Sequence, residues 1–452
     1  MELHRLCLIL LLAIGSQGSL LDYVKGNFFL GKKWVVLVAG SDGWENYRHQ
    51  ADVAHAYQVV RRNGIPEENI IVMMANDVVN HTSNWAPGTL INQPNGTDVY
   101  KGIKIDYAGS NVTKENFLSV LKGDKHKMSK IGSGKVVKSS SHDNIFINFV
   151  GDGESGVVYF PGNKPLYADE LIRTLKELYI RRKYEKILLY VDACYSGSMF
   201  DGLLDDNKSI LAITAAGPRE NAYTYYYDEQ YDTYLGDEFG ISWMENWDKV
   251  IVEASKEASA RTVFKHYEKT RTKVTDSNVM IYGDFHLGFE KLSSFIGFSY
   301  GQSSASKTNK VLNLLKTGDV AEFALKRQLI DTKDQIKRES LSREIGHKKN
   351  KKQLADKIMN EIYKKVVKEM PEVAAKIGTL EKPAHLKLNM DMFPCYRSIV
   401  NHISEKCFSF LKNRQVQINI FANICVVNEK AHHFINKFID VACQHGMRST
   451  QL

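Results

Sequence analysis

The sequence lacks an apolar run long enough to cross a bilayer. Its most apolar stretch, residues 6–14, is about half the ~20 residues that a membrane-spanning helix needs. Arg5 precedes this stretch and the small residues Ser16 and Gly18 follow it, a pattern typical of a secretory signal peptide. We therefore expect residues 1–18 to be a signal peptide and the mature protein to have no membrane span. A buried N-terminal helix is the alternative.

Cysteine is scarce, with six residues in the whole chain. Cys7 would leave with the signal peptide, so an odd number remains. Four of the remaining cysteines cluster near the C-terminus and can form two disulfides, although their spacing leaves three pairings open: Cys395, Cys407, Cys425 and Cys443. Cys194 stands alone. An unpaired thiol in a secreted protein is either buried and inert or chemically used.

Passage through the secretory route would also allow N-glycosylation. Four sequons fit the acceptor pattern, beginning at Asn80, Asn95, Asn111 and Asn207. Three of these lie in one polar stretch, which indicates a glycosylated surface.

We find no internal repeat, but charge is divided unevenly along the chain. Residues 331–452 hold 22 Lys and Arg against 13 Asp and Glu, a net charge of +9, which leaves −1 for the rest of a chain whose total is +8. Basic regions often bind nucleic acid or membranes. We expect no nucleic-acid partner here and interpret the surplus as a solvated helical surface with a local cluster at 348–352. Docking on acidic patches of the N-terminal part is a third interpretation.

The first part of the chain alternates apolar runs with helical spacing. Strands are predicted at 34–39, 70–74, 144–150, 187–191 and 210–214, and helices at 50–62 and 168–179. Apolar strands separated by helices indicate a mostly parallel sheet covered on both faces. Ligands of such folds bind beyond the carboxyl ends of the strands.

The pattern changes after about residue 295. Residues 299–307 are rich in serine and suggest a linker. Helix formers dominate from residue 326, and 353–367 has helical apolar spacing. We expect a domain at 28–295, a linker or activation region at 296–330, and an all-α disulfide-bonded domain at 331–452.

Polar clusters follow three predicted strands, so a parallel sheet would bring them to one edge. They are 41–49, 151–154 and 192–198. Cys194 lies in the third cluster, at a strand end before a Gly/Ser turn, where a nucleophile would be placed. Taken alone, a cysteine after an apolar run is more often a buried core residue.

Several of these stretches resemble the legumain family of asparaginyl endopeptidases, cysteine peptidase family C13. They are VAGSDGWENYRHQAD at 38–52, PNGTDVY at 94–100, SGSM at 196–199 and TYLGD at 233–237. The resemblance covers about residues 30–295 and continues more weakly into the C-terminal part, where the cysteine spacing matches. It implies a caspase-like fold, a helical prodomain, the disulfides Cys395–Cys425 and Cys407–Cys443, and a lysosomal, vacuolar or extracellular location.

The same resemblance implies that Cys194 is the nucleophile, and it exposes a departure. The family's third strand ends in Asp-His-Gly, whereas this chain has Gly151-Asp152-Gly153, so Asp152 stands where the catalytic histidine belongs. Gly153 remains to form the oxyanion hole with Cys194. Asn46, which supports the histidine in the family, remains without its partner. An aspartate disfavours the thiolate that a histidinium would stabilise, so activity should be lost or weak.

The family's specificity pocket is largely retained. By resemblance, Arg48 donates to the carbonyl of an asparagine side chain and Asp237 accepts from its NH2 group, beside His49. Asp192 replaces a longer glutamate, and Asn221 stands where the family has serine. Arg48 and Asp237 as a purely structural ion pair is the alternative.

Two further positions differ from the family. Tyr195 replaces an acidic residue after the nucleophile, and Asp331 stands where the family cuts itself after an asparagine. A chain unable to cut would have little use for that asparagine.

Three hypotheses follow. The first is a peptidase homologue with little or no activity that still binds asparagine-containing peptides. The second is an active lysosomal enzyme with a non-standard dyad, in which a protonated Asp152 donates to the leaving amine. The third is a non-catalytic decoy for cystatin-type inhibitors. All three expect the C-terminal prodomain as an internal partner and neither cofactor nor metal.

Overall fold

The computed structural model describes residues 31–252, 260–298, 314–407 and 418–448. The predicted signal peptide, Cys7 and the serine-rich linker at 299–307 lie outside these residues. No helix within the described ranges combines the length and the apolar character needed to cross a bilayer.

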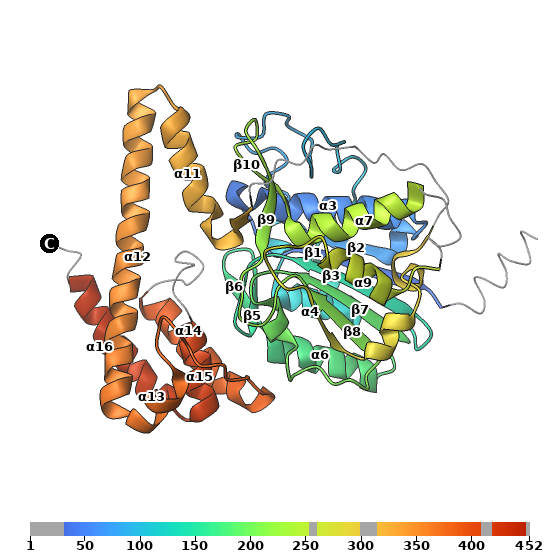
Figure 1. Ribbon diagram of the computed structural model, residues 1–452. Helices are drawn as coiled ribbons and strands as arrows, with labels where there is room; N and C mark the ends of the chain where they lie inside the picture. The colour runs from blue at the N-terminus through green and yellow to red at the C-terminus, as the bar shows by residue number, and fades with distance from the viewer. Residues whose placement is uncertain (1–30, 253–259, 299–313, 408–417, 449–452) are drawn as a thin grey trace, which may run out of the picture.

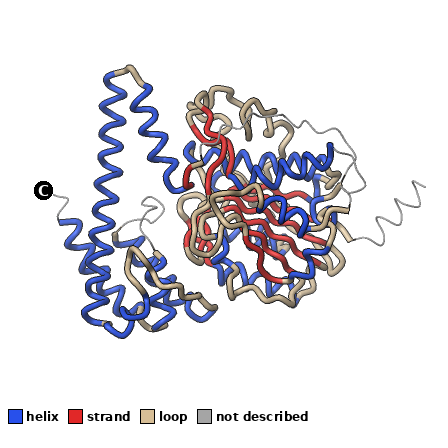
Figure 2. Tube along the Cα trace, in the orientation of Figure 1, coloured by secondary structure: helices blue, strands red, loops and turns tan. Residues whose placement is uncertain are grey.

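A six-stranded sheet forms the centre of the N-terminal part (Figures 1 and 2). Its order is β11 (Met280–Gly283), β8 (Ile210–Thr214), β7 (Lys186–Asp192), β3 (Asn144–Val150), β1 (Lys33–Ala39) and β2 (Ile70–Met73). β11 pairs antiparallel with β8, and the other neighbours are parallel. In β1, β3 and β7 every residue except the first is buried. These strands are continuously apolar because both faces of the sheet are covered.

Helices cover each face of the sheet and bury a separate core. One core contains side chains of α4 (Lys114–Lys122) and α6 (Ala168–Ile180). The other contains side chains of α3 (Tyr47–Arg62), α7 (Glu238–Val252), α9 (Val263–Arg271) and α10 (Ser293–Ile296). The short α5 (Lys125–Met128) follows α4.

Two small antiparallel sheets lie beyond the carboxyl ends of the central strands. One consists of β4 (Gly153–Glu154), β5 (Val157–Phe160) and β6 (Lys164–Tyr167). The other consists of β10 (Thr233–Asp237), β9 (Tyr223–Asp228) and β12 (Leu315–Lys316). Both sheets flank the polar clusters that the sequence placed at this edge.

The C-terminal part is entirely helical among the residues that the structure describes. It comprises α11 (Val320–Asp331), α12 (Gln335–Glu369), α13 (Pro371–Ile377), α14 (Phe393–Lys406), α15 (Asn419–Val427) and α16 (His432–Arg448). Disulfides join Cys395 to Cys425 and Cys407 to Cys443. Its core is continuous with that of the α4 and α6 face. Contacts such as Tyr396 Oη to Ser155 O (2.7 Å) attach it to the sheet domain.

The predicted fold class is confirmed: a mostly parallel sheet flanked by helices, with an all-α, disulfide-bonded C-terminal part. The disulfide pairing implied by the family resemblance is confirmed as well. The segment predicted as a linker or activation region contains β12 and α11, so its second half has regular structure. Of the sequon asparagines, Asn80, Asn95 and Asn207 are exposed and Asn111 is half-buried.

Candidate active site

Cys194 lies just beyond the carboxyl end of β7, near the middle of the sheet. Cys194 is buried, with 7% of its surface exposed. Tyr195, which follows, has a left-handed backbone (φ 55°), and its N–H donates to Glu220 O at 2.8 Å. Left-handed backbone is costly for a residue with a Cβ and is retained only where its surroundings impose it. The buried strand and this turn together fix the position of the sulfur.

The sulfur has a hydroxyl and a backbone amide as neighbours. Sγ is hydrogen-bonded to Thr317 Oγ1 at 2.7 Å, and Ala222 N–H donates to it at 3.3 Å. Burial raises the pKa of the Cys194 thiol to about 12, and the charges of Glu154 and Asp152 act in the same direction. The hydrogen bonds from Thr317 and Ala222 oppose this shift without reversing it. The thiol is therefore protonated at any physiological pH.

Thr317 reaches the sulfur from a distant segment of the chain. Leu315 and Lys316 of β12 pair antiparallel with Thr224 and Tyr223 of β9. Thr317 N–H then donates to Ala222 O at 3.2 Å. This segment therefore adds a short strand to the edge of β9 and covers the thiol. The linker assignment gave no indication of this contact.

The residues at the end of β3 pack directly against the cysteine. A Cβ at Gly153 would lie 2.3 Å from Cys194 O, so only glycine fits there. Asp152 is buried beside it. Asn46, in the short 3-10 helix before α3, donates through Nδ2 to Asp42 O at 2.9 Å. Its Oδ1 is buried with no hydrogen-bond partner among the described residues.

A second polar group lies at the N-terminal end of α3. Arg48 Nε donates to Asp237 Oδ1 at 2.8 Å, and Arg48 Nη1 donates to Glu45 O at 2.7 Å. Both side chains of the ion pair are almost fully buried. Arg48 Nη2 is buried without a hydrogen-bond partner in the described part of the chain. His49 Nε2 lies 3.3 Å from Asp237 Oδ2 and hydrogen-bonds Ser41 through Nδ1.

Asp237 also belongs to a group of three buried carboxylates whose oxygens lie within 4.8 Å of one another. The other two are Asp52 and Asp192. Asp52 accepts from Asn92 Nδ2 at 2.7 Å and from Asp237 N–H at 2.9 Å, and Asp192 accepts from Gly240 N–H at 2.9 Å. Burial raises the pKa of both Asp52 and Asp192 well above the usual value, and the charge of Asp237 adds to the effect.

A free donor on Arg48 beside these acceptors suits a ligand that offers both a carbonyl and an amine, as a carboxamide does.

The comparisons with known proteins identify the family. The family model for the peptidase C13 family matches residues 33–299. The chain belongs to peptidase family C13, the legumain family. It is 39% identical to rat legumain over 87% of this chain and 89% of that protein, and 40% identical to human legumain over 84% and 85%. It is 33% identical to the vacuolar-processing enzyme delta-isozyme of Arabidopsis thaliana over 87% of each.

One solved structure, caspase-1 from Spodoptera frugiperda, aligns with a TM-score of 0.32 and 10% identity, over 56% of this chain and 88% of that one. That likeness is too distant to bear on the fold. The legumain and vacuolar-processing relatives and the disulfides fit a secretory, lysosomal or vacuolar location.

The structure brings most of the predicted site residues to the same edge of the sheet. Arg48, His49, Asp192 and Asp237 form one buried group, and Asp152 and Gly153 lie against Cys194. Asn221 precedes Ala222, whose amide reaches the sulfur, and is itself half-buried. The roles assigned to these residues remain predictions.

Sequence reasoning missed three residues of the site. Asp52 follows Arg48 by four positions on α3, a spacing that puts two side chains on one helix face, so it could have been found. Asn92 comes from a loop and Thr317 begins a short 3-10 helix, Thr317–Asp319, and neither carries such a signal.

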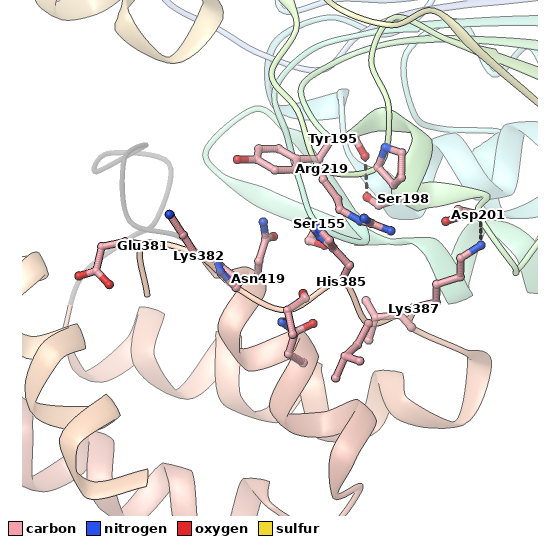
Figure 3. A pocket seen from close by; sticks show the side chains of 16 residues that line it. Ser155, Tyr195, Ser198, Asp201, Arg219, Glu381, Lys382, His385, Lys387 and Asn419 are labelled. Carbon is pink, nitrogen blue, oxygen red and sulfur yellow. Dashed lines mark hydrogen bonds and ion pairs between the residues drawn. The ribbon is translucent and has the colours of Figure 1, made fainter. Parts of the chain in front are cut away.

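A cavity of about 410 Å³ lies beside the site, where the two parts of the chain meet (Figure 3). Tyr195, Ser198 and Arg219 line it from the sheet domain, and residues 381–388 line it from the helical part. Cys194 does not line it. The cavity is therefore a feature of the boundary between the two parts, separate from the covered thiol.

Proposed function

We propose that this protein is a legumain-type peptidase homologue whose hydrolytic activity is lost or weak and whose asparagine pocket is retained. The observation that carries the proposal is the environment of Cys194: a hydroxyl and an amide contact the sulfur, and the family's histidine position holds Asp152. A cysteine peptidase needs a thiolate and a group that returns a proton to the leaving amine. Neither requirement is met by these neighbours.

The proposed pocket is the buried group around Arg48 and Asp237. Arg48 Nη2, which lacks a partner among the described residues, donates to the side-chain carbonyl of a bound asparagine, and Asp237 accepts from the NH2 group. Because both charges are already paired in a fixed geometry, the pocket is organised before the ligand arrives.

In the same proposal, residues 331–452 act as a prodomain in a protein that follows the secretory route to a lysosome or vacuole. Residues 315–317, which precede α11, cover the sulfur. Peptide access to the site therefore depends on displacing this segment.

Turnover of an asparagine-ended fluorogenic peptide tests the loss of activity. The assay compares the unmodified chain, Cys194→Ala as the blank, Asp152→His, and Asp152→Asn as the matched control that removes the negative charge without adding a base. Each is assayed at pH 5 and pH 7, before and after limited trypsin treatment, for which Lys316 is an exposed site within the covering segment itself.

We expect the unmodified chain and Asp152→Asn to stay at the blank level. Asp152→His should rise about a hundredfold above it once residues 315–317 are displaced, because a positioned acid–base group contributes a factor of about 10²–10⁴. Turnover by the unmodified chain well above the blank, abolished by alkylation of Cys194, would show instead a working enzyme with a non-standard dyad.

Binding tests the pocket separately. After trypsin treatment, a fluorescent peptide ending in asparagine should bind the Cys194→Ala protein, and Arg48→Met should remove the binding. Equal binding of a peptide that ends in leucine would mean that the pocket does not read the carboxamide.

A further inference from the structure

The N-terminal half of α12 carries a dense basic segment, residues 337–352. It contains seven Lys and Arg against two Glu within one helix. At a rise of ~1.5 Å per residue, these charges extend over about 22 Å. The densest part is the run of four lysines at 348, 349, 351 and 352.

This segment stands away from the sheet domain. In Figure 1 the N-terminal half of α12 lies beside α11, while its C-terminal half joins the other C-terminal helices. Among residues 337–352 only Leu341 is buried, whereas Lys348, Lys349 and Lys351 are exposed and Lys352 is half-buried. Most of the charged side chains therefore face solvent on a projecting helical hairpin.

The protein itself neutralises little of this charge. Lys348 has one carboxylate within ion-pair distance, Glu344 at 3.9 Å on the same helix. Within the described residues, no carboxylate lies at ion-pair distance from Lys349 or Lys351. Glu322 on α11 pairs with Lys326, and the charges of Lys352 and Lys348 also lower its pKa. Among the described residues the basic segment has no closer acidic partner on another element, in contrast to Arg397, whose guanidinium lies 2.6 Å from Asp169 across the boundary between the two parts of the chain.

We propose that the basic segment is a binding surface for a linear sulfated polysaccharide. Lysine ammonium groups are compact point charges that pair with sulfate and carboxylate oxygens, and a linear polyanion releases counterions when a row of cations neutralises it. Proteins that fit a secretory, lysosomal or vacuolar location meet such polymers. The proposal is independent of any peptidase activity.

The arrangement of the charges favours a polymer over a lipid surface. A helix that lies on a membrane needs an apolar face opposite its basic face. Here the four lysines at 348, 349, 351 and 352 share one side of the helix, within an arc of about 160° at about 100° per residue. The opposite side is not apolar, because it carries Glu339, Gly346 and Asn350. Leu341 is buried and so offers no apolar anchor. The face that would have to enter a bilayer is therefore polar, whereas a linear polyanion needs only the row of cations.

Heparin serves as the probe for a binding test on the full chain. In one variant, Lys348, Lys349, Lys351 and Lys352 are all replaced by glutamine, which is a good helix former and should keep α12 intact. In the matched control, the exposed Lys125, Lys127, Lys130 and Lys138 of the sheet domain are replaced by glutamine. Both variants lose the same charge. Circular dichroism checks that both stay folded.

A lysine near an anionic surface contributes about a fivefold factor to affinity. We therefore expect the α12 variant, which lacks four lysines, to bind heparin roughly several hundredfold more weakly near 0.15 M salt, with the control within about threefold of the unmodified chain. On a sulfopropyl ion exchanger, which reads overall charge, the two variants should elute alike.

Equal losses of heparin affinity in the two variants would overturn the proposal, because binding would then follow total charge. Tighter binding to phosphatidylserine vesicles or to duplex DNA than to heparin, lost in the α12 variant, would also overturn it in favour of those partners.

Discussion

The environment of Cys194 predicts that this thiol reacts very slowly with iodoacetamide. Alkylation requires the thiolate, and burial raises the pKa of the thiol to about 12, compared with about 8.5 for an ordinary cysteine. At pH 8 an ordinary cysteine is about one-quarter thiolate, whereas a thiol with a pKa of 12 is about one part in ten thousand. The folded chain should therefore react roughly two thousand times more slowly than the same cysteine in unfolded chain.

Mass spectrometry of the peptide that contains Cys194 measures this rate directly. The four C-terminal cysteines are joined in disulfides and do not compete. The rate should rise about tenfold per pH unit from pH 7 to pH 10 without levelling off near 8.5. The same chain unfolded in guanidinium chloride supplies the reference rate at each pH.

Two substitutions should move the rate in opposite directions. Thr317→Val keeps the side-chain shape but removes a hydrogen bond that lowers the thiol pKa, so alkylation should slow further. Asp152→Asn removes a negative charge that raises the pKa, so alkylation should accelerate. Two results would refute this account: a folded-state alkylation rate within tenfold of the unfolded reference at pH 8, or an alkylation rate that levels off below pH 7. Either result would mean that a neighbouring group stabilises the thiolate of Cys194.

Three further outcomes follow from the buried groups. Asp237→Ala leaves the Arg48 guanidinium buried without its carboxylate and should lower the free energy of unfolding by about 3–5 kcal/mol, measured in denaturant; a loss below 1 kcal/mol would contradict the pairing. Burial raises the pKa of Asp192, so its contribution to stability is complete below about pH 3.9 and is lost as the pH rises through the raised value. Asp192→Asn should therefore raise the melting temperature at pH 7.5 and leave it unchanged near pH 3.5, and equal gains at both would count against the shift. Replacing Cys395 and Cys425 by alanine opens a link across 30 residues and should cost about 3–4 kcal/mol, seen as earlier unfolding of the C-terminal helices in denaturant.

The sequence predicts the central sheet well because buried parallel strands are continuous apolar runs. β1, β3, β7 and β8 lie within a residue of their expected bounds. β9 was not predicted, because its run of tyrosines is amphipathic and its pairing depends on β10 and β12 from other parts of the chain. The first half of α12 lies in the region predicted to be all-α, but no bounds were predicted for it, because it packs against α11 and lacks an apolar stripe.

Site residues that directly follow strands were predicted from the sequence. Site residues that reach the site through long-range chain contacts were not. Cys194 and Asp152 end neighbouring parallel strands, so topology alone brings them together. Thr317 arrives from 123 positions further along the chain, and no local pattern announces such a contact. The long-range partner is the residue that decides whether the thiol is accessible.

The retained residues of the site do not all carry the same information. Some of them would be kept for folding alone, whereas others are not explained by folding. Arg48 and Asp237 form a buried ion pair, and removal of either leaves an uncompensated charge, so folding alone would preserve both. Asn46 is held by its Nδ2 bond to Asp42 O, but its Oδ1 is buried with no hydrogen-bond partner among the described residues, and an unsatisfied acceptor costs about 1–3 kcal/mol. That oxygen lacks the N–H donor that the family's histidine would provide. Under the proposal that this site has lost the family's histidine, Asp152→His should supply that donor, so the variant should also gain free energy of unfolding relative to Asp152→Asn.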